Sequence, residues 1–336
     1  MDRLPGSPLP GVLAPLYGRE HDLGRLLDLL RGSARLLILR GPGGIGKTAL
    51  ALHLAQALRA PGESSQFDHV QVIDFSAVRE PERVMGLIAA ALPEGGLDGK
   101  PERRIQDFAA WHRTLLLLDN FEQLLPAVSV LSDLLAGTDT LRLVVTSRAA
   151  LRLHDAVEYP VEPLALAHSA RDAVSSPAVR LFVARVQALT PSFVLDAGNA
   201  AQVARLCEVL EGVPLALELA AVRTRSYSLG DLLARLEHPL NVLKADFQDR
   251  PERLRSLRAA VQWSYDLLED LDRAVFECCA VFDGPFTPEA LATVWGSSEV
   301  IDGAESLLAQ SFLRQLDTPD TLWKMLQPLR EAVGAV

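Results

Sequence analysis

The chain has 336 residues, of which 49% are hydrophobic and 23% are charged, and its formal net charge at pH 7 is −10. This composition is that of an ordinary globular protein with enough apolar material for two or three domains. The negative charge disfavours a protein whose main role is nucleic-acid binding, because such proteins usually present a basic surface, although a local basic stripe would still be compatible with it.

The N-terminal residues 1–16 are rich in proline and predict an extended lead-in, which a short helix follows at about 20–31. These prolines break the apolar stretch that a secretion signal needs, and no apolar run in the sequence approaches the ~20 residues of a membrane span. The three cysteines have no metal-binding spacing and are expected to be reduced and buried. We therefore expect a cytoplasmic protein with no membrane association.

The segment 41–48, Gly-Pro-Gly-Gly-Ile-Gly-Lys-Thr, matches the phosphate-loop pattern G-x-x-x-x-G-K-[ST] in full. An apolar run of strand length precedes it at 34–40, and a helical pattern follows it. The glycines let backbone N–H groups turn toward phosphates, and the start of the helix adds a partial positive charge. We expect Lys47 to contact the β- and γ-phosphates of ATP or ADP, and the Thr48 hydroxyl to bind Mg²⁺. The residues predicted to bind the nucleotide here are Gly43, Gly44, Ile45, Gly46, Lys47 and Thr48 of this segment and Ala49, which follows it.

Four further apolar runs have the length of strands, and helical patterns separate them. Near-continuous apolar strands that alternate with helices indicate a parallel sheet covered on both faces, with right-handed helical crossovers. We therefore expect residues 17–165 to form one α/β domain, a P-loop nucleotide-binding domain. The expected strands after 34–40 are 69–75, 114–119, 141–146 and a weaker one at 156–161, and the expected helices are about 48–59, 81–92, 101–112 and 122–136.

The pattern changes after Pro163, where helical periodicity continues without a strand signal. Ser176 is a good N-cap residue with Pro177 at the first helical position, and the helix that follows is one of four expected in a small domain at 166–240. A last domain is expected at 251–336, mostly helical, with a short hairpin. The other expected features are helices at about 197–210, 214–224 and 228–236, a linker at 238–250, and the hairpin at about 311–325.

The hydrophobic strand 114–119 ends in the carboxylate of Asp119. Many buried strands end in this way, but after a complete phosphate loop the position is typical of a residue that holds Mg²⁺, together with Thr48. The next residue is Asn120, where fast ATPases of this layout place a carboxylate that polarises the attacking water. Glu122 is nearby, but its spacing makes it a poor substitute. The sequence therefore supports nucleotide binding better than turnover, and we expect a slow ATPase at most.

Arg148 follows the next strand, in the run Thr146-Ser147-Arg148. A guanidinium at this strand end could contact the γ-phosphate through paired hydrogen bonds. A solvated arginine after a strand is the alternative, and the residue alone does not decide between them. The candidate catalytic residues are thus Lys47, Asp119 and Arg148.

Taken in order, the motifs of this chain resemble the NB-ARC ATPases of the STAND class, the signal-transduction ATPases of plant resistance proteins, the apoptosome and many bacterial regulators. The resemblance covers nearly the whole chain from Tyr17 onward. The motifs that carry it, besides the phosphate loop, are Tyr17-Gly18-Arg19-Glu20, Leu118-Asp119-Asn120-Phe121-Glu122, Thr146-Ser147-Arg148, Gly212-Val213-Pro214-Leu215-Ala216-Leu217, and Trp263-Ser264-Tyr265-Asp266-Leu267-Leu268 with Val281-Phe282-Asp283-Gly284.

This resemblance implies a fold and a mode of action. The fold is a P-loop NTPase parallel sheet followed by a small helical domain and a winged-helix domain. The resemblance implies that Tyr17, Gly18 and Arg19 border the adenine, and that Pro214 and Leu215 contact the nucleotide from the helical domain. It also implies a molecular switch of a signalling or transcription-regulatory protein, closed with ADP and open and self-associating with ATP. Such a switch requires that the two nucleotides make different contacts in the two states.

One departure from the resembled family affects the contact that would hold the closed, ADP-bound state. Many of its members carry Met-His-Asp late in the winged helix, and that histidine contacts the β-phosphate of ADP. The matching segment here is Met325-Leu326-Gln327, in which Leu326 cannot donate a hydrogen bond. Lys324 and Arg330 are the candidates to replace the histidine. Members of the family usually continue into sensor repeats, so we expect the sensor or effector partner to lie outside this chain.

Two other functions are compatible with a phosphate loop. A turnover enzyme, such as a motor ATPase or a small-molecule kinase, is disfavoured by Asn120 and by the lack of a substrate-shaped charge cluster. A DNA-binding regulator acting through the winged helix is the other. Residues 251–336 contain seven Lys and Arg against fourteen Asp and Glu, a net charge of −7. Because phosphate binding needs the opposite sign, we expect no direct DNA binding.

Overall fold

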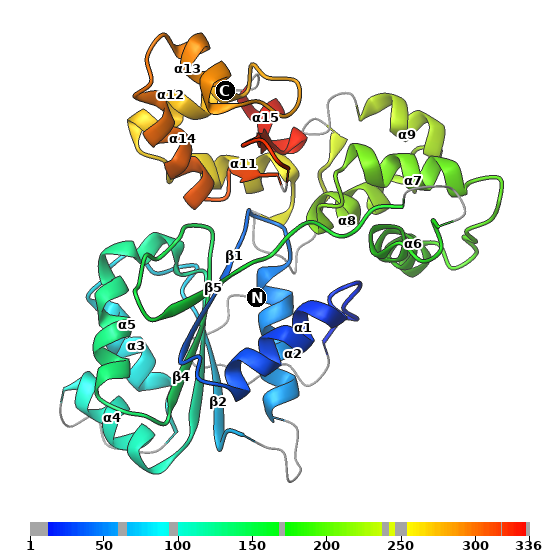
Figure 1. Cartoon of the computed structure of the whole chain (residues 1–336). Coiled ribbons are helices and arrows are strands. Elements are labelled where there is room, and N and C mark those ends of the chain that lie inside the picture. Colours follow the sequence, from blue (N-terminus) through cyan, green and yellow to red (C-terminus); the bar gives the residue numbers. More distant parts are fainter. Residues whose placement is uncertain are drawn as a thin grey trace. The chain divides into compact units, whose positions relative to one another are not determined.

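The structure, a computed structural model, describes residues 13–59, 66–93, 100–167, 172–236, 242–245, 254–316 and 318–333. It divides into two compact units (Figure 1). The sheet unit consists of the residues before Pro42 together with Lys47–Val161, and the helical unit consists of Pro42–Gly46 and Glu162–Val336. Most of the expected lead-in and most of the expected linker lie outside the described residues.

The sheet unit is built on five parallel strands in the order β2-β3-β4-β1-β5. Each strand agrees with its expected range to within two residues at either end, so the predicted parallel α/β sheet is confirmed. Every residue of β3 is buried, because the strand lies inside the sheet with helices on both sides. The strands are β1 (Leu36–Arg40), β2 (His69–Asp74), β3 (Thr114–Asp119), β4 (Leu141–Ser147) and β5 (Ala156–Pro160).

Helices cover both faces of this sheet. In Figure 1, α1 and α2 lie on one face, and α3, α4 and α5 lie on the other. On the second face, Leu116 and Leu118 of β3 belong to one buried apolar cluster with Ile88 of α3 and Leu131 of α5. These helices are α1 (Glu20–Arg31), α2 (Lys47–Arg59), α3 (Arg83–Ala91), α4 (Pro101–Trp111) and α5 (Val128–Ala136).

The helix expected at 122–136 differs from the observed one. Its first half is a 3₁₀ helix, η1 (Phe121–Ala127), and only the second half is the α-helix α5. Pro126 lies inside η1, and proline has no N–H to give to an α-helical hydrogen bond. The consequence for the site is that Glu122 lies in the tight turn directly after β3.

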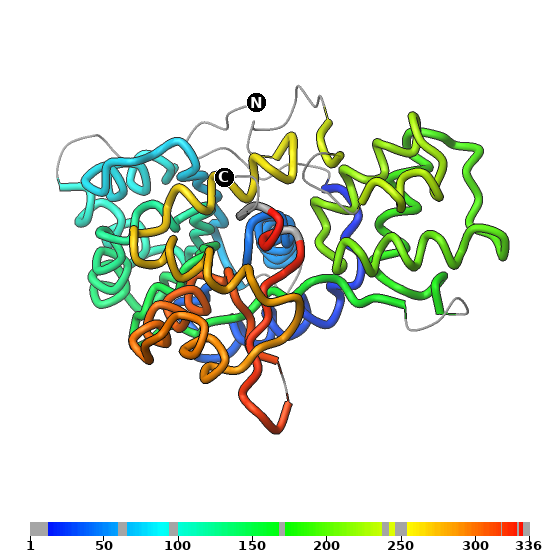
Figure 2. Tube along the Cα trace, turned by 90° about the horizontal axis from the view of Figure 1, so that it is seen from above, coloured from blue at the N-terminus to red at the C-terminus, as the bar shows by residue number. Residues whose placement is uncertain are grey.

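The helical unit begins with four packed helices (green in Figure 2), in which α6 packs on α8. Ser176 caps α6, because its Oγ accepts a hydrogen bond from the N–H of Val179 at 3.5 Å. Five further helices and an antiparallel hairpin follow among the described residues, and the hairpin confirms the expected one. The elements are α6 (Pro177–Leu189), α7 (Ala200–Val209), α8 (Pro214–Arg223), α9 (Leu229–Arg235), α11 (Leu257–Tyr265), α12 (Asp270–Cys279), α13 (Pro288–Trp295), α14 (Val300–Ala309), β6 (Leu313–Gln315), β7 (Trp323–Met325) and α15 (Gln327–Val333).

The turn that starts α8 depends on a glycine. Gly212 has φ 67°, and a Cβ at this position would lie 2.2 Å from the carbonyl oxygen of Leu164. The N–H of Leu164 in turn donates to the carbonyl of Gly212 at 3.0 Å. Only glycine fits both the left-handed backbone and this close approach without a backbone shift. The glycine thereby fixes the start of α8, where Pro214 and Leu215 lie.

Burial governs the chemistry of two of the cysteines. Burial raises the pKa of Cys207 and of Cys279 to about 12, so both remain protonated thiols near neutral pH. Protonated, buried thiols react slowly. None of the helices that the structure describes has both the length and the apolar character of a membrane span.

Candidate nucleotide-binding site

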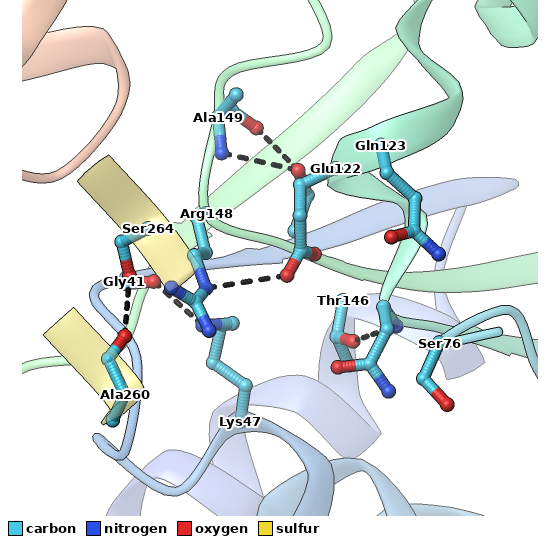
Figure 3. A network of polar contacts seen from close by, with 12 residues as sticks. Gly41, Lys47, Ser76, Glu122, Gln123, Thr146, Arg148, Ala149, Ala260 and Ser264 are labelled. Atoms are coloured by element: carbon cyan, nitrogen blue, oxygen red, sulfur yellow. Dashed lines mark hydrogen bonds and ion pairs between the residues drawn. The ribbon is translucent and has the colours of Figure 1, made fainter. Parts of the chain in front are cut away.

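The phosphate loop joins β1 to α2 with two glycines in the left-handed backbone region. Gly44 has φ 78° and Gly46 has φ 99°. The helix α2 starts at Lys47, so Thr48 and Ala49 lie in its first turn, where backbone N–H groups lack helical partners. The Lys47 side chain is buried, and its Nζ donates to the carbonyl of Gly41 at 2.6 Å (Figure 3). The predicted residues Gly43 and Ile45 belong to the same loop.

The two predicted Mg²⁺ ligands lie in contact. The hydroxyl of Thr48 donates to Oδ1 of Asp119 at 2.9 Å, and the hydroxyl of Thr146 on β4 donates to the same oxygen. Burial raises the pKa of Asp119 to about 6; the hydrogen bond from Thr146 opposes this rise, and the Asp74 carboxylate adds to it. A hydroxyl and a carboxylate are hard oxygen donors, which suit Mg²⁺, and such sites complete the coordination with water and nucleotide phosphates. The residues present therefore fit the ion.

Asn120 connects two carboxylates at the ends of neighbouring strands. Its Nδ2 donates to Oδ1 of Asp74 at 2.9 Å and to Oδ2 of Asp119 at 3.1 Å. Its backbone is left-handed, with φ 60° and ψ 49°, and its N–H donates to Oγ1 of Thr146 at 2.9 Å. Sequence reasoning missed Asp74, although its place at the end of an expected strand was a usable signal.

Arg148 follows β4 and is almost completely buried. Its Nε lies 3.2 Å from Oε1 of Glu122, and the two side chains are 10% and 4% exposed (Figure 3). The other Glu122 carboxylate oxygen, Oε2, is buried and has no hydrogen-bond partner among the described residues. Arg148 is thus not the solvated arginine that was the alternative. Its contact with a γ-phosphate stays a prediction.

The N-terminal motif forms a second polar cluster in the sheet unit. Gly18 has φ 64°, and Arg19, directly before α1, is 5% exposed. Its Nη1 lies 3.1 Å from Oδ2 of Asp22, whose Oδ1 accepts a hydrogen bond from the hydroxyl of Tyr159 at 2.5 Å. Arg19 is therefore fixed by a carboxylate of its own helix. The adenine contacts assigned to Tyr17, Gly18 and Arg19 remain predictions.

Within the helical unit, the start of α8 contacts the loop residues 42–46. The N–H of Leu215 donates to the carbonyl of Gly44 at 3.1 Å. A Cβ on Gly44 would lie 2.7 Å from Cβ of Leu215, and a Cβ on Gly46 would lie 3.9 Å from Cγ of Pro214. Leu215 therefore contacts Gly44, and Pro214 lies close to Gly46, so two residues predicted to bind nucleotide lie beside two glycines predicted to cradle its phosphates.

The two candidates to replace the missing histidine, Lys324 and Arg330, each form an ion pair with a carboxylate. Lys324 Nζ donates to Oε1 of Glu211 at 2.5 Å, and the other oxygen of Glu211 accepts the N–H of Gln327 at 2.6 Å. Arg330 forms an ion pair with Asp283. Leu326 itself is 7% exposed. Glu211 therefore joins the turn before α8 to the start of α15, a contact that the sequence did not reveal.

Comparisons with known proteins identify relatives of this chain. Residues 35–177 match the family model of the NACHT domain. The uncharacterized protein Rv0894 of Mycobacterium tuberculosis (strain ATCC 25618 / H37Rv) is 32% identical over 302 residues, with 88% of this chain and 72% of that protein covered. Rv0890c of the same strain, whose name proposes an HTH-type transcriptional regulator, is 30% identical over 307 residues, with 88% of this chain and 33% of that protein covered. Among solved structures, the Walker-type ATPase PABY2304 of Pyrococcus abyssi aligns with a TM-score of 0.61 at 16% identity over 96% of both chains.

The parallel sheet, the phosphate loop and the NACHT match define a P-loop NTPase of the STAND class. The chain belongs to the same protein family as Rv0894. It spans about a third of the length of Rv0890c. The similarity to PABY2304 supports the fold alone, since the identity is only 16%. The STAND class was predicted correctly, whereas the NB-ARC arrangement with its winged helix stays a prediction.

Proposed function

We propose that this chain is the ATP/ADP-dependent switch of a signalling or transcription-regulatory protein. The observation that carries the proposal is the direct contact of Thr48 with Asp119 next to the buried cation of Lys47. These groups supply what a nucleoside triphosphate needs: a cation for its β- and γ-phosphates and oxygen ligands for its Mg²⁺. The relative whose name proposes a transcriptional regulator supports the regulatory setting.

The two nucleotides act through different residues. ADP requires the phosphate loop and Lys47, and ATP adds a γ-phosphate that Arg148 can contact. Hydrolysis is expected to be slow because Asn120, the residue directly after Asp119, is an amide and cannot itself take a proton from the attacking water. Bound Mg²⁺ lowers the cost of the charge that develops on the transferred phosphoryl group.

The off state of the proposed switch is the closed form with ADP bound. The contact of Leu215 supports this state. Its N–H donates to the carbonyl of Gly44, which belongs to the loop proposed to bind the phosphates of ADP. The ion pair of Lys324 with Glu211 also supports this state, because it holds the turn before α8 against the segment that would carry the missing histidine. ATP favours an open form that self-associates, and a sensor or effector region outside this chain reads that change in the cytoplasm.

Nucleotide content tests this proposal. We expect the purified chain to carry ADP, identified by mass spectrometry after denaturation, and to be monomeric by light scattering. Replacing the bound ADP by a slowly hydrolysed ATP analogue with Mg²⁺ is expected to give larger assemblies. The γ-phosphate is the group in which the two nucleotides differ, so its contacts must favour the open state. A chain that binds neither ADP nor ATP would overturn the proposal. Steady-state turnover well above about one per minute would favour a turnover ATPase instead.

Duplex DNA is not expected to bind the chain specifically at physiological salt. The physical reason is the net charge of −7 in residues 251–336, which repels a phosphate backbone. A gel-shift titration of the whole chain with random and genomic duplexes measures this. Sub-micromolar binding that depends on sequence would contradict the expectation and favour the DNA-binding alternative.

A further inference from the structure

Asp74 lies at the carboxyl end of β2, directly opposite Asp119 at the end of β3. Its Oδ1 accepts two hydrogen bonds, from the N–H of Ser76 at 2.8 Å and from Nδ2 of Asn120 at 2.9 Å. Its Oδ2 accepts none from the residues that the structure describes, and the residue is only half-buried. Asp74 therefore presents a fixed carboxylate with one oxygen available to a water molecule.

Asn120 is the residue that connects this carboxylate to the predicted site. Both hydrogens of its amide are donated, one to Asp74 and one to Asp119. Its left-handed backbone is held by the hydrogen bond from its N–H to Thr146. An amide so fixed cannot turn to serve as the strong acceptor that an attacking water needs, but it holds Asp74 in place.

The other carboxylates near the phosphate loop are already engaged. Oδ1 of Asp119 accepts from Thr48 and Thr146, and its Oδ2 accepts from Asn120. Glu122 is paired with Arg148, and its side chain is 4% exposed. Among the carboxylates of this cluster, Asp74 is thus the one with both solvent access and an acceptor oxygen to spare.

We propose that Asp74 orients the attacking water for hydrolysis of ATP, so that strand β2 supplies the carboxylate that is missing after strand β3. The proposal rests on the proposed function, because it concerns ATP at the same site. Asp74 accepts a hydrogen bond from the water through Oδ2, and Asn120 fixes Asp74. The water oxygen bonds to the γ-phosphorus, the bond to the β–γ bridging oxygen breaks, and its electron pair leaves with ADP. Both water protons end on the released phosphate, as dihydrogen phosphate.

The variant Asp74→Asn tests this role with little structural change. The single side-chain oxygen of this variant can still accept the hydrogen bonds from Ser76 and Asn120. Its NH₂ group then takes the place of Oδ2. This group can only donate a hydrogen bond, whereas the attacking water needs an acceptor there. We expect the single-turnover rate of ATP hydrolysis to fall at least about tenfold. The affinity for ADP and the melting temperature are expected to stay at their wild-type values. A hydrolysis rate within about threefold of wild type would overturn the proposal.

The control is Asp68→Asn, directly before the first residue of β2 and so at the opposite end of the strand from Asp74. Asp68 also accepts a backbone N–H, from Arg113 at 2.8 Å, so its loss reports a purely structural effect of the same kind. This control is expected to hydrolyse ATP at the wild-type rate. If Asp74→Asn lowers ADP affinity and melting temperature together with the rate, Asp74 is structural and the proposal fails.

A double variant, Asp74→Asn with Asn120→Asp, exchanges the amide and the carboxylate between positions 74 and 120. It keeps the hydrogen bond between positions 74 and 120 and restores a carboxylate beside the site, so hydrolysis is expected to recover. A double variant no faster than Asp74→Asn would contradict the water-orienting role. A wild-type chain that binds ATP but never hydrolyses it would also overturn the inference, whereas one that fails to bind nucleotide would contradict the proposed function.

Discussion

Replacing Lys47 with alanine is expected to weaken the binding of both ADP and ATP by at least about a hundredfold. Lys47 is a buried cation whose Nζ is held at the carbonyl of Gly41, at the mouth of the phosphate loop. Without it the negative charge of the β-phosphate has no buried counter-charge, and a charge in a buried site is costly unless it is paired. Isothermal titration with each nucleotide measures the effect. The rise in melting temperature that nucleotide gives to the wild-type chain should disappear too.

A matched control is Lys100→Ala, which removes an exposed lysine just before α4 in the same unit. It changes the net charge by the same amount and is expected to leave both affinities unchanged. If Lys47→Ala binds ADP as tightly as the wild-type chain, the phosphate loop is not the nucleotide site. Equal losses in both variants would instead indicate a long-range effect of charge.

The strands could be predicted from the sequence because their apolar runs are continuous. A strand buried on both faces, such as β3, has no alternating pattern to misread, and its boundaries follow from polar residues. The phosphate loop was equally readable, since its spacing has a direct physical meaning. The bend at η1 was not predicted, because Pro126 was read as part of a continuous helix.

The partners of the site residues could not be predicted. The pairing of Asp74 with Asn120 depends on β2 lying next to β3, and that of Arg148 with Glu122 depends on β4 lying on the other side. Strand order is set by the packing of the whole sheet, and no local pattern in the sequence encodes it. The spacing of Glu122 after Asp119 led us to discount it, whereas the structure gives it the role of holding Arg148.

The affinity for Mg²⁺ is expected to depend strongly on pH through the protonation of Asp119. Burial raises the pKa of this carboxyl from its ordinary value of 3.8 to about 6. The folded chain therefore holds the proton more tightly than the unfolded chain does. Without ligands, folding loses up to about 3 kcal/mol of stability as the pH rises from below 4 to above 6. Mg²⁺ binds the deprotonated form, so the extra affinity that Mg²⁺ gives to ATP should appear as the pH rises through about 6.

The variant Asp119→Asn separates the contribution of this carboxylate from that of the phosphate loop. It keeps an oxygen that can accept from Thr48 and Thr146 but has no charge to titrate. We expect it to bind ATP without Mg²⁺ about as well as the wild-type chain. Above about pH 6 the gain from Mg²⁺ should be smaller than in the wild-type chain, and the step near pH 6 that belongs to Asp119 should be absent. Titrations with ATP from pH 5 to 8, with Mg²⁺ and with a chelator, measure both quantities. A wild-type step that persists in Asp119→Asn would assign the titration to another group and remove Asp119 from the Mg²⁺ site.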